Sequence, residues 1–321
     1  MGEFELIRRH FARPAAPGSA VVLGVGDDCA LLRPSPGHLL AVSTDMLVEG
    51  RHFFADVDPA ALGHKALAVN LSDLAAMGAR PLGFTLALSL PRADEAWLSA
   101  FASGLFALAD AHACPLVGGD TTRGPLNICI TVFGELRPGH ALRRDAGQAG
   151  DDLYISGRTG EARLALAQLR GETWAPQPPN ADARTRLERP TPRLALGLAL
   201  AGIARAALDV SDGLLGDLGH ILAASAVGAD IELAALPVAP TLAGLAEAQR
   251  LECLLAGGDD YELLFTAAPG MRDDVMAAAH ASDTPVTRIG RLTERPLLRL
   301  LDADGQPVAQ PLLRGFDHFA D

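Results

Sequence analysis

Apolar positions with helical spacing alternate along the chain with short apolar runs typical of buried strands. Asp58 and Pro59 precede a long alanine- and leucine-rich stretch, where aspartate favours the cap of a helix and proline its first turn. A similar alternation follows a polar, glycine-rich and basic stretch at 136–151. The expected elements are strands at 39–43, 84–90, 127–135, 152–156, 207–210, 230–233, 261–267 and 286–292, and helices at 58–77, 94–112, 160–169, 191–206, 213–225 and 271–281.

This alternation predicts an α/β chain of two successive domains. The basic stretch is the expected linker, so the first domain comprises residues 1–137, the linker 138–150 and the second domain 151–321. Within the second domain, the proline-rich segment 171–189 is expected to be a loop. A length of 321 residues and a hydrophobic content of 49% agree with two domains that each bury a core.

Charge and composition narrow the classes of function. The net charge of −12 and an aromatic content of 5% argue against a nucleic-acid binder, because phosphates need a basic surface. The four cysteines are scattered and form no C-x-x-C pair, which favours a reducing cytoplasm over a zinc site or a disulfide framework. A charged N-terminal stretch and the lack of a long uncharged apolar run predict neither a signal peptide nor a membrane span.

Acidic residues gather in glycine- or serine-flanked turns that follow apolar runs. In α/β domains, carboxylates at strand ends point into the crevice where ligands bind. Several carboxylates there repel one another unless cations neutralise them, and oxygen donors without a His or Cys cluster favour Mg²⁺, which commonly serves substrate phosphates. The segments are GVGDDCA (24–30), STD (43–45), NLSDLAAMGA (70–79), VGGDTTRG (117–124), DVSDGL (209–214) and GGDDYEL (257–263).

Any phosphate chemistry must therefore use metals and arginine. The chain lacks G-x-x-x-x-G-K-[ST], and Lys65 is its only lysine. The G-V-G at 24–26 does not continue as the dinucleotide fingerprint G-x-G-x-x-G. Glycine pairs at 118–119 and 257–258 would allow the backbone to approach a ligand closely.

Each candidate also has an ordinary structural interpretation. Asp73 lies in a helical pattern among apolar residues, where an unpaired carboxylate is costly, and Asn70 is one turn away on the same face; this favours a functional role for Asp73. Asp209 and Asp212 could instead cap the following helix. The other residues with ordinary interpretations, as polar groups or as a docking aromatic, are His52, His64, Arg143, Arg144 and Phe316.

In combination, the acidic segments resemble the motifs of thiamine-monophosphate kinases, a family of the superfamily that includes aminoimidazole ribonucleotide synthetase. The resemblance runs in order from Gly2 to Phe319, nearly the whole chain, and two of its segments, NLSDLAAMGA and VSDGLxxDLGHI, are long enough to be specific. The matching segments are GEFELI, GVGDDCALL, VSTDMLVEGRHF, KALAVNLSDLAAMGARP, LVGGDTTRGPL, LDVSDGLLGDLGHI, GGDDYELLFT and GFDHF.

The resemblance implies a two-domain aminoimidazole ribonucleotide synthetase-like fold of the α/β (α+β) class. Its N-terminal domain would form a β-barrel shared with its twin in a homodimer. The implied enzyme transfers the γ-phosphoryl group of ATP, directly and in line, to thiamine monophosphate with the help of several Mg²⁺ ions. The acceptor phosphate is already ionised near neutral pH, so no Ser-His-Asp arrangement is required.

The resemblance also implies roles for individual residues, of which Asp45, Asp73, Asp120 and Asp212 form the catalytic group. Two positions depart from the family pattern: Asp259 stands where glutamate is usual, and Phe316 where tyrosine or tryptophan is frequent. The implied roles are magnesium binding for Asp28, Ser43, Thr44, Asp45, Asp73, Asp120, Asp209 and Asp212, nucleotide contact for Gly119, Asp120, Arg144 and Ser211, and thiamine-phosphate contact for His52, Asp259 and Phe316.

Two alternatives remain. Another member of the superfamily would act on a ribonucleotide amide, a carbamoyl group or selenide; selenide chemistry favours a reactive cysteine in an N-terminal glycine-rich loop, where Cys29 in GDDCA is more simply a packed neighbour. Hydrogenase maturation would favour a C-terminal cysteine, whereas the chain ends in HFAD. A non-catalytic nucleotide-binding scaffold would be expected to lose several carboxylates, yet all six acidic segments retain theirs.

Overall fold

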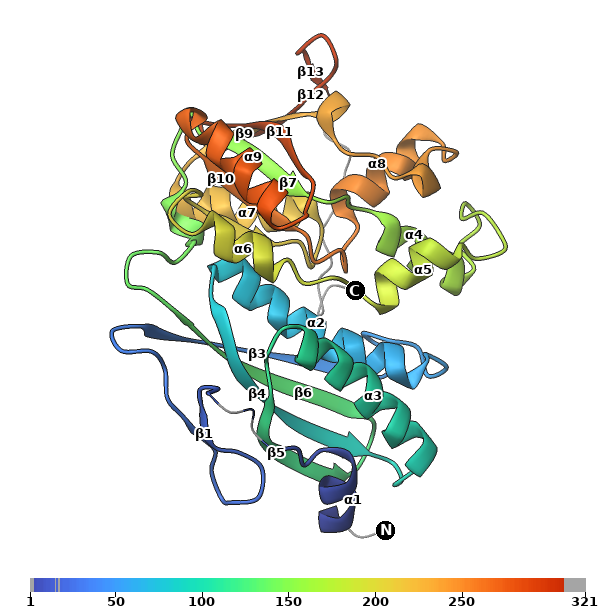
Figure 1. The fold of residues 1–321 in the computed structure, drawn as a ribbon. Coiled ribbons are helices and arrows are strands. Elements are labelled where there is room, and N and C mark those ends of the chain that lie inside the picture. The colour runs from blue at the N-terminus through green and yellow to red at the C-terminus, as the bar shows by residue number, and fades with distance from the viewer. Residues whose placement is uncertain (1–2, 15, 17, 309–321) are drawn as a thin grey trace. The chain divides into compact units, whose positions relative to one another are not determined.

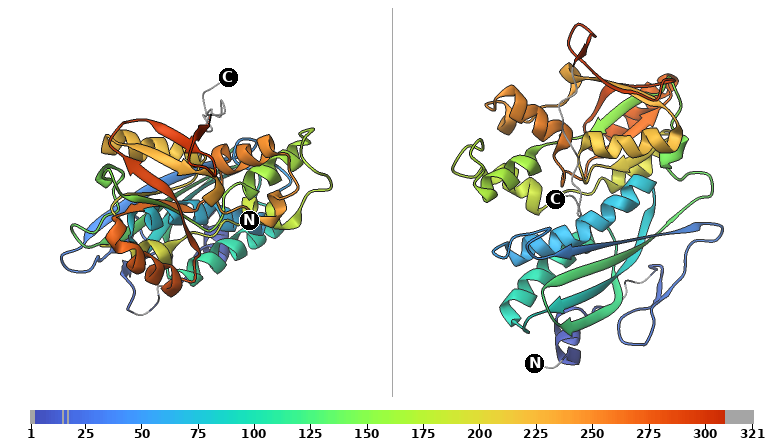
Figure 2. Two further views of the ribbon diagram at one scale, coloured as in Figure 1. Left: turned by 90° about the horizontal axis from the view of Figure 1, so that it is seen from above. Right: turned by 180° about the vertical axis from the view of Figure 1, so that it is seen from behind.

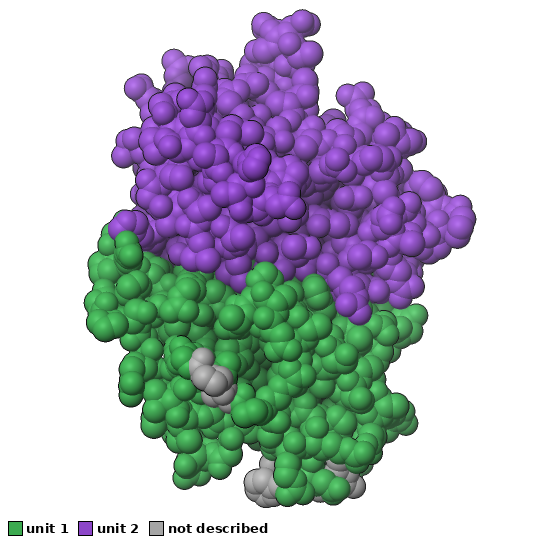
Figure 3. Space-filling view, viewed as in Figure 1, with its two compact units in different colours: residues 1–74, 79–139 green, residues 75–78, 140–321 purple. Residues whose placement is uncertain are grey.

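The computed structural model describes residues 3–14, 16 and 18–308. The chain divides into two compact units, which Figure 3 shows in different colours. Unit 1 comprises residues 1–74 and 79–139, and unit 2 comprises residues 75–78 and 140–321. The division between Gly139 and His140 lies inside the polar stretch 136–151.

Unit 1 is built on a four-stranded sheet that helices cover on one face. Its elements are α1 (Glu3–His10), β1 (Val21–Leu23), β2 (Leu31–Leu32), β3 (Leu39–Val48), α2 (Pro59–Met77, of which 75–77 belong to unit 2), β4 (Arg80–Leu90), α3 (Glu95–Ala111), β5 (Leu116–Arg123) and β6 (Asn127–Leu136). The strand order is β3-β6-β4-β5, with β6 antiparallel to both neighbours and β4 parallel to β5. Helices α2 and α3 lie on the same face of this sheet (Figures 1 and 2).

The two covering helices start where the sequence predicts and pack very closely. Asp58 Oδ1 accepts the N–H of Ala61 at 2.8 Å, which caps α2 as expected. Asp94 caps α3 in the same way. A Cβ on Gly104 would lie 1.8 Å from the carbonyl oxygen of Ala60, so only glycine permits this backbone contact between α3 and the start of α2.

The two faces of the unit 1 sheet differ in exposure because side chains alternate along each strand. On β3, Ser43 and Asp45 face the helices and are half-buried, whereas Val42 and Met46 on the other face are exposed. The sheet is open within the described part of unit 1, with β3 and β5 as its edges. The uncovered face therefore presents apolar side chains that the helices do not reach.

Unit 2 contains a seven-stranded mixed sheet in the order β13-β12-β9-β11-β7-β10-β8. Neighbouring strands are antiparallel except β9 and β12, which run parallel. Its elements are β7 (Asp152–Ser156), α4 (Glu161–Arg170), α5 (Ala181–Glu188), α6 (Leu194–Leu200), β8 (Ala207–Asp209), α7 (Leu214–Ser225), β9 (Gly228–Glu232), α8 (Glu247–Ala256), β10 (Leu263–Ala267), α9 (Arg272–Ala281), β11 (Val286–Thr293), β12 (Leu298–Leu301) and β13 (Pro307–Val308).

Helices lie on both faces of this sheet, with α7 on one side and α6 and α9 on the other (Figures 1 and 2). On the α7 side, Leu218 packs in a core with Ile155 of β7 and Leu264 of β10, to which α4, α5 and α8 also contribute. On the other side, the rings of Tyr154 and Phe265 stack at a centroid distance of 5.2 Å. The site loops described below extend from this three-layer frame.

Several expected elements are confirmed and others need correction. The helix at 94–112 and the strand at 207–210 are present within a residue or two of their expected ends. The helix expected at 191–206 is short, because α6 ends at Leu200. The loop expected at 171–189 contains α5, which Asn180 caps by accepting the N–H of Ala183 at 2.9 Å. Helix α8 was not expected.

Two of the acidic segments that were expected to be turns lie within strands. Residues 43–45 belong to β3, which continues to Val48 because it pairs with β6 over its whole length. Residues 118–120 belong to β5, which pairs with β4. Antiparallel pairing predominates, and each unit combines a mixed sheet with helices, in agreement with the expected α/β (α+β) class. None of the helices in the described residues is long and apolar enough to span a membrane.

Candidate functional site

Two residues of β3 meet two residues of α2 on the helix-covered face of the unit 1 sheet. Ser43 Oγ donates a hydrogen bond to Asp73 Oδ2 at 2.5 Å, and the backbone N–H of Asp45 donates to Asn70 Oδ1 at 3.1 Å. Strand alternation places Ser43 and Asp45 on one face, and a spacing of three residues places Asn70 and Asp73 on one side of the helix. The expected common face of Asn70 and Asp73 is therefore confirmed.

The carboxylates of this cluster influence each other. Burial, and then the neighbouring Asp73 carboxylate, raise the pKa of Asp45 to about 6. Burial and the charge of Asp45 likewise raise the pKa of the Cys129 thiol on β6. Negative charge is thus concentrated between β3 and α2, and a cation there would relieve the repulsion.

The uncovered face of the same sheet carries Thr44 and Asp120. Thr44 Oγ1 and Thr131 Oγ1 share a hydrogen bond at 2.8 Å, and Asp120 pairs with Ala87. Because β3 and β5 are opposite edges of the sheet, three strand spacings of roughly 5 Å separate Thr44 from Asp120. The predicted magnesium residues of unit 1 are therefore distributed over both faces.

Gly119, the predicted nucleotide-contact residue before Asp120, has a backbone that other residues rarely adopt. Its φ is +146°, and an added Cβ would lie 1.9 Å from the carbonyl oxygen of Leu86. The close contact of β5 with β4 at this point therefore requires glycine. The exposed residue that follows, Asp120, is held on the uncovered face by this contact.

Asp28 and His52 lie in loops of unit 1. Asp28 lies in the exposed loop after β1, and its N–H donates to Asp27 Oδ1 at 2.8 Å. His52 lies in the turn after β3, where its Nδ1 accepts the N–H of Val48 at 3.0 Å. A neutral His52 ring must then carry its proton on Nε2, so that this nitrogen is a donor.

Two loops of unit 2 lie side by side where β8 ends and β10 begins. The N–H of Asp259 donates to the carbonyl oxygen of Ser211, and the N–H of Tyr261 donates to that of Val210, both at 2.8 Å. A Cβ on Gly258 would lie 2.3 Å from the Ser211 carbonyl oxygen, so this approach requires glycine. The structure thereby brings Asp259 close to the loop that holds the predicted residues Ser211 and Asp212, which follows the predicted residue Asp209 at the end of β8.

Asp217, which was not among the expected site residues, lies behind the loop that follows β8. Its Oδ2 accepts the backbone N–H groups of Ser211, Asp212 and Gly213 at 3.0, 3.0 and 3.1 Å. Burial raises the pKa of Asp217 to about 6, although the N–H groups act to lower it. The motif DGLLGD could have identified Asp217 in the sequence, because a carboxylate in the first turn of a helix can bind N–H groups that precede the helix.

The neighbouring arginines 143 and 144 have different contacts. Arg143 pairs with Asp145, with Nε donating to Oδ1 at 2.8 Å. Arg144 opens the short 3₁₀ helix η1 (Arg144–Ala146) and is exposed, while its carbonyl oxygen accepts from Ser225 Oγ at 2.7 Å. The third predicted thiamine-side residue, Phe316, lies outside the described residues.

The donor atoms in unit 1 match a hard cation. Within residues 3–14, 16 and 18–308, no three His, Cys, Asp or Glu side chains are arranged around one point as a metal site. Mg²⁺, however, is usually held by one or two carboxylates while it binds substrate phosphates and water. The oxygen donors of Ser43, Asp45 and Asp73 fit such an ion. A phosphate ligand would complete its coordination shell.

Comparisons with known proteins agree over nearly the full length. The sequence matches the models of AIR synthase related protein, N-terminal domain, at residues 26–136 and C-terminal domain at residues 148–302. The thiamine-monophosphate kinase of Escherichia coli K12 is 46% identical, over 99% of this chain and 98% of that protein. The solved thiamine-monophosphate kinase from Stenotrophomonas maltophilia K279a is 48% identical with a TM-score of 0.84, over 91% of this chain and 93% of that one. The structure of AaThiL complexed with AMPPCP and TMP is 28% identical with a TM-score of 0.75, over 89% of each chain.

Proposed function

The chain belongs to the thiamine-monophosphate kinase family, and we propose that it transfers the γ-phosphoryl group of ATP to thiamine monophosphate, giving thiamine diphosphate and ADP. The observation that carries the proposal is the 46% identity to the Escherichia coli kinase over nearly the whole of both chains. The complex of AaThiL with AMPPCP and TMP supports the pairing of a nucleotide with a thiamine phosphate.

The proposed transfer is direct and in line. The nucleophile is a phosphate oxygen of thiamine monophosphate, which is ionised near neutral pH because the second phosphate pKa is about 6. No side chain therefore has to remove a proton from the acceptor. The protein contributes alignment of the two phosphates and neutralisation of their charge.

The proposed magnesium residues are centred on Asp45 and Asp73, with the Ser43 hydroxyl as a further oxygen donor. When bound, magnesium neutralises the phosphate oxygens and the repelling carboxylates. The raised pKa of Asp45 supports this assignment, since burial and Asp73 favour a bound cation or proton. We propose that more than one magnesium ion binds. The remaining proposed ligands are Asp28, Thr44, Asp120, Asp209 and Asp212.

We assign nucleotide contact to Gly119, Asp120, Arg144 and Ser211 and thiamine contact to His52, Asp259 and Phe316. The hydrogen bond from Asp259 to the Ser211 carbonyl supports neighbouring thiamine and nucleotide sites in unit 2. The exposed guanidinium of Arg144 provides a positive charge for phosphates.

We further propose a homodimer in which the uncovered face of the unit 1 sheet pairs with its twin to form a shared barrel. Exposed apolar residues on β3 support this proposal, because burying them would contribute to association. Val42→Asp, at a position that is 55% exposed, should leave the fold intact and give a monomer in sedimentation velocity. A wild-type protein that sediments as an active monomer would rule the dimer out.

We propose a cytoplasmic location, which agrees with the free thiol state of the cysteines. All four cysteines are free thiols, of which Cys114 and Cys253 are buried. Burial raises the pKa of each of these two thiols to about 12, so they are unreactive in the folded protein. A reducing compartment would preserve this state.

The proposed activity is tested by identifying the product with each acceptor in turn. Purified protein with ATP and Mg²⁺ should convert thiamine monophosphate to thiamine diphosphate, separated by chromatography, with equal release of ADP. Free thiamine should react far more slowly, because its hydroxyl would need a base that the assigned site does not provide.

The same assay separates the alternatives. Asp259→Glu restores the usual family residue and should be tolerated, whereas Asp259→Ala should raise the KM for thiamine monophosphate more than that for ATP. Equal turnover of free thiamine, or absence of thiamine diphosphate, would contradict the proposed acceptor. ATP consumption with a ribonucleotide amide, a carbamoyl donor or selenide would favour another reaction of the superfamily.

A further inference from the structure

The segment that carries Asp259 has an unusual backbone. Asp259 and Tyr261 have φ values of +64° and +51°, a left-handed conformation that side chains other than glycine seldom adopt. Such a conformation persists only where the surroundings hold it. Tyr261 Oη donates to Asp259 Oδ1 at 3.3 Å, so this backbone also determines where the Asp259 carboxylate lies.

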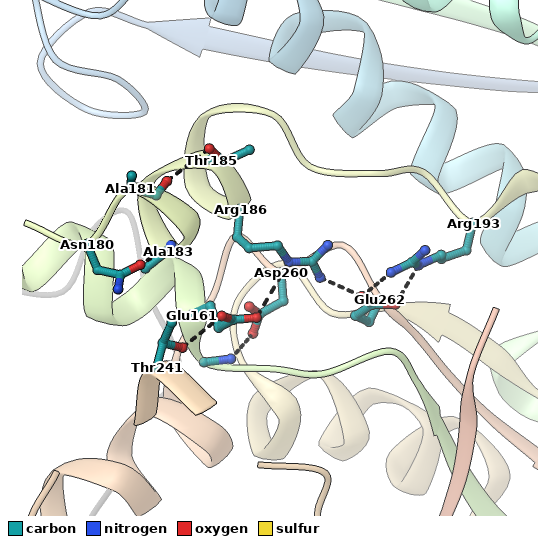
Figure 4. Close-up of polar contacts among 11 residues, drawn as sticks. Glu161, Asn180, Ala181, Ala183, Thr185, Arg186, Arg193, Thr241, Asp260 and Glu262 are labelled. Carbon is teal, nitrogen blue, oxygen red and sulfur yellow. Dashed lines mark hydrogen bonds and ion pairs between the residues drawn. The ribbon is translucent and has the colours of Figure 1, made fainter. Parts of the chain in front are cut away.

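Glu262 anchors one end of the segment (Figure 4). Arg193 donates to both of its carboxylate oxygens at 2.6 and 2.7 Å, and Arg186 donates to Oε1 at 2.6 Å. Ser156 Oγ donates to Glu262 Oε2 at 2.5 Å and accepts the N–H of Leu263 at 2.8 Å. Although burial acts to raise it, these arginines bring the pKa of Glu262 below its ordinary value.

Asp260, between the two left-handed residues, points into the same buried cluster (Figure 4). Its Oδ2 accepts the N–H of Gly160, the residue that precedes α4, at 2.8 Å. Its Oδ1 is buried and has no hydrogen-bond partner among the residues that the structure describes. Asp260 therefore ties the turn to the start of α4.

The charges of the cluster balance only if Asp260 is neutral. Arg186 lies between Glu262 and Glu161, whose Oε2 is 4.0 Å from Arg186 Nε, and Arg193 is the second cation. Two arginines therefore match two glutamates. Burial raises the pKa of Asp260 well above its ordinary value despite the opposing influence of Gly160 and Arg186. A neutral carboxyl group at Asp260 can still accept the Gly160 hydrogen bond.

We propose that Asp260 is a positioning residue for thiamine monophosphate, because it holds the left-handed turn that places the Asp259 carboxylate. The inference rests on the proposed function, in which Asp259 contacts the thiamine side. Asp260 is only 3% exposed, so it acts through its neighbour and not by touching the substrate. Its side chain needs hydrogen-bonding capacity and neutrality, both of which asparagine supplies.

The test measures KM and kcat for both substrates in Asp260→Ala, Asp260→Asn, Asp259→Ala and the double alanine variant. Asp260→Ala should raise the KM for thiamine monophosphate about tenfold while the KM for ATP changes by less than about twofold. Asp260→Asn should restore a nearly normal KM. If Asp260 acts through Asp259, the double variant should be no worse than Asp259→Ala alone.

A merely structural role would give a different pattern. It would lower the melting temperature of Asp260→Ala while leaving the KM ratio of the two substrates unchanged, and it would make the two alanine effects multiply. Either result would overturn the proposal. If Asp260→Ala does not fold, the Asp260→Asn and Asp259→Ala variants decide: an Asp260→Asn enzyme as impaired for thiamine monophosphate as Asp259→Ala contradicts a neutral positioning role.

Failure of the underlying function is recognised separately in the wild-type protein. Thiamine monophosphate that neither binds to the wild type in titration calorimetry nor yields thiamine diphosphate would refute the proposed function, and the positioning role with it. Wild-type activity combined with multiplying alanine effects would refute the positioning role alone.

Discussion

Carboxylates are buried in both units, but their surroundings differ. In unit 1, burial and the neighbouring Asp73 act in the same direction and raise the pKa of Asp45 to about 6. In unit 2, burial also acts to raise the pKa of Glu262, yet hydrogen bonds and charge from Arg193 and Arg186 lower it. Asp45 thus lies beside a like charge, whereas Glu262 lies between two guanidinium groups.

The difference separates acidic residues that await a ligand from those that stabilise the fold. Two nearby carboxylates cost free energy, and such a cost is typical of functional sites. A carboxylate with two guanidinium partners has its hydrogen bonds satisfied within the protein. We therefore propose ligand binding for Asp45 and Asp73, and structural support for Glu262.

Glu262→Gln is expected to have the largest effect on stability. It would leave Arg186 and Arg193 without their buried carboxylate, which should lower the free energy of unfolding by about 3–5 kcal/mol. Urea denaturation at neutral pH measures the loss. Glu232→Gln is the matched control, because Glu232 pairs with Arg288 but its side chain is 43% exposed, and it should cost about 1 kcal/mol or less. Equal losses would remove the distinction.

Asp45→Asn should separate activity from stability. We expect kcat to fall about 100-fold, or about 3 kcal/mol, because a proposed magnesium ligand is lost. Stability without magnesium should not fall, since a buried charge near Asp73 is removed and the backbone bond to Asn70 remains. Steady-state kinetics and urea denaturation of one preparation test both parts. The control is Asp110→Asn, at an exposed partner of Arg13, which should change neither kcat nor stability. An Asp45→Asn protein that is destabilised but active would contradict the proposed role of Asp45.

The pH dependence of stability should reveal Asp260. Because its folded pKa lies well above its unfolded value, the folded protein keeps a proton that the unfolded chain releases as pH rises above about 4. The stability that protonated Asp260 contributes is thus fully present at acidic pH and is lost as pH rises towards the folded pKa. Asp260→Asn should therefore gain stability relative to wild type between about pH 5 and 7, by about 1–2 kcal/mol. A difference that stays constant with pH would place an ionised Asp260 in the cluster.

Asp217→Asn should have the smallest effect of the four. The amide can accept some of the N–H groups of residues 211–213 but brings a competing NH₂ group, which should cost about 1 kcal/mol of stability. The KM for ATP should rise more than that for thiamine monophosphate, because Ser211 is assigned to the nucleotide. Kinetics with both substrates check this. A change confined to the KM for thiamine monophosphate would indicate that the loop contacts that substrate and not the nucleotide.

Helix starts and the common face of Asn70 and Asp73 could be predicted from the sequence because they depend on local spacing. Asp58 and Asp94 carry their capping groups within three residues of the N–H groups they bind. The resemblance to thiamine-monophosphate kinases was also correct, since it rested on ordered motifs along the whole chain.

Long-range pairing explains what the sequence did not reveal. Residues 43–45 were expected in a turn, but the pairing of β3 with β6 extends the strand through them. Helix α5 was missed because its apolar residues Ala183 and Leu187 pack into a core assembled from distant segments. The cluster of Asp260 and Glu262 depends on Arg186 and Arg193, about 70 residues earlier, a separation that no local pattern contains.

The most direct test of the account measures thiamine diphosphate and ADP while Mg²⁺ is titrated into wild type and Asp45→Asn with ATP and thiamine monophosphate. We expect equal amounts of both products in the wild type, no turnover in EDTA, and a much higher Mg²⁺ requirement in Asp45→Asn. ADP release without thiamine diphosphate, or the same Mg²⁺ dependence in both proteins, would contradict it.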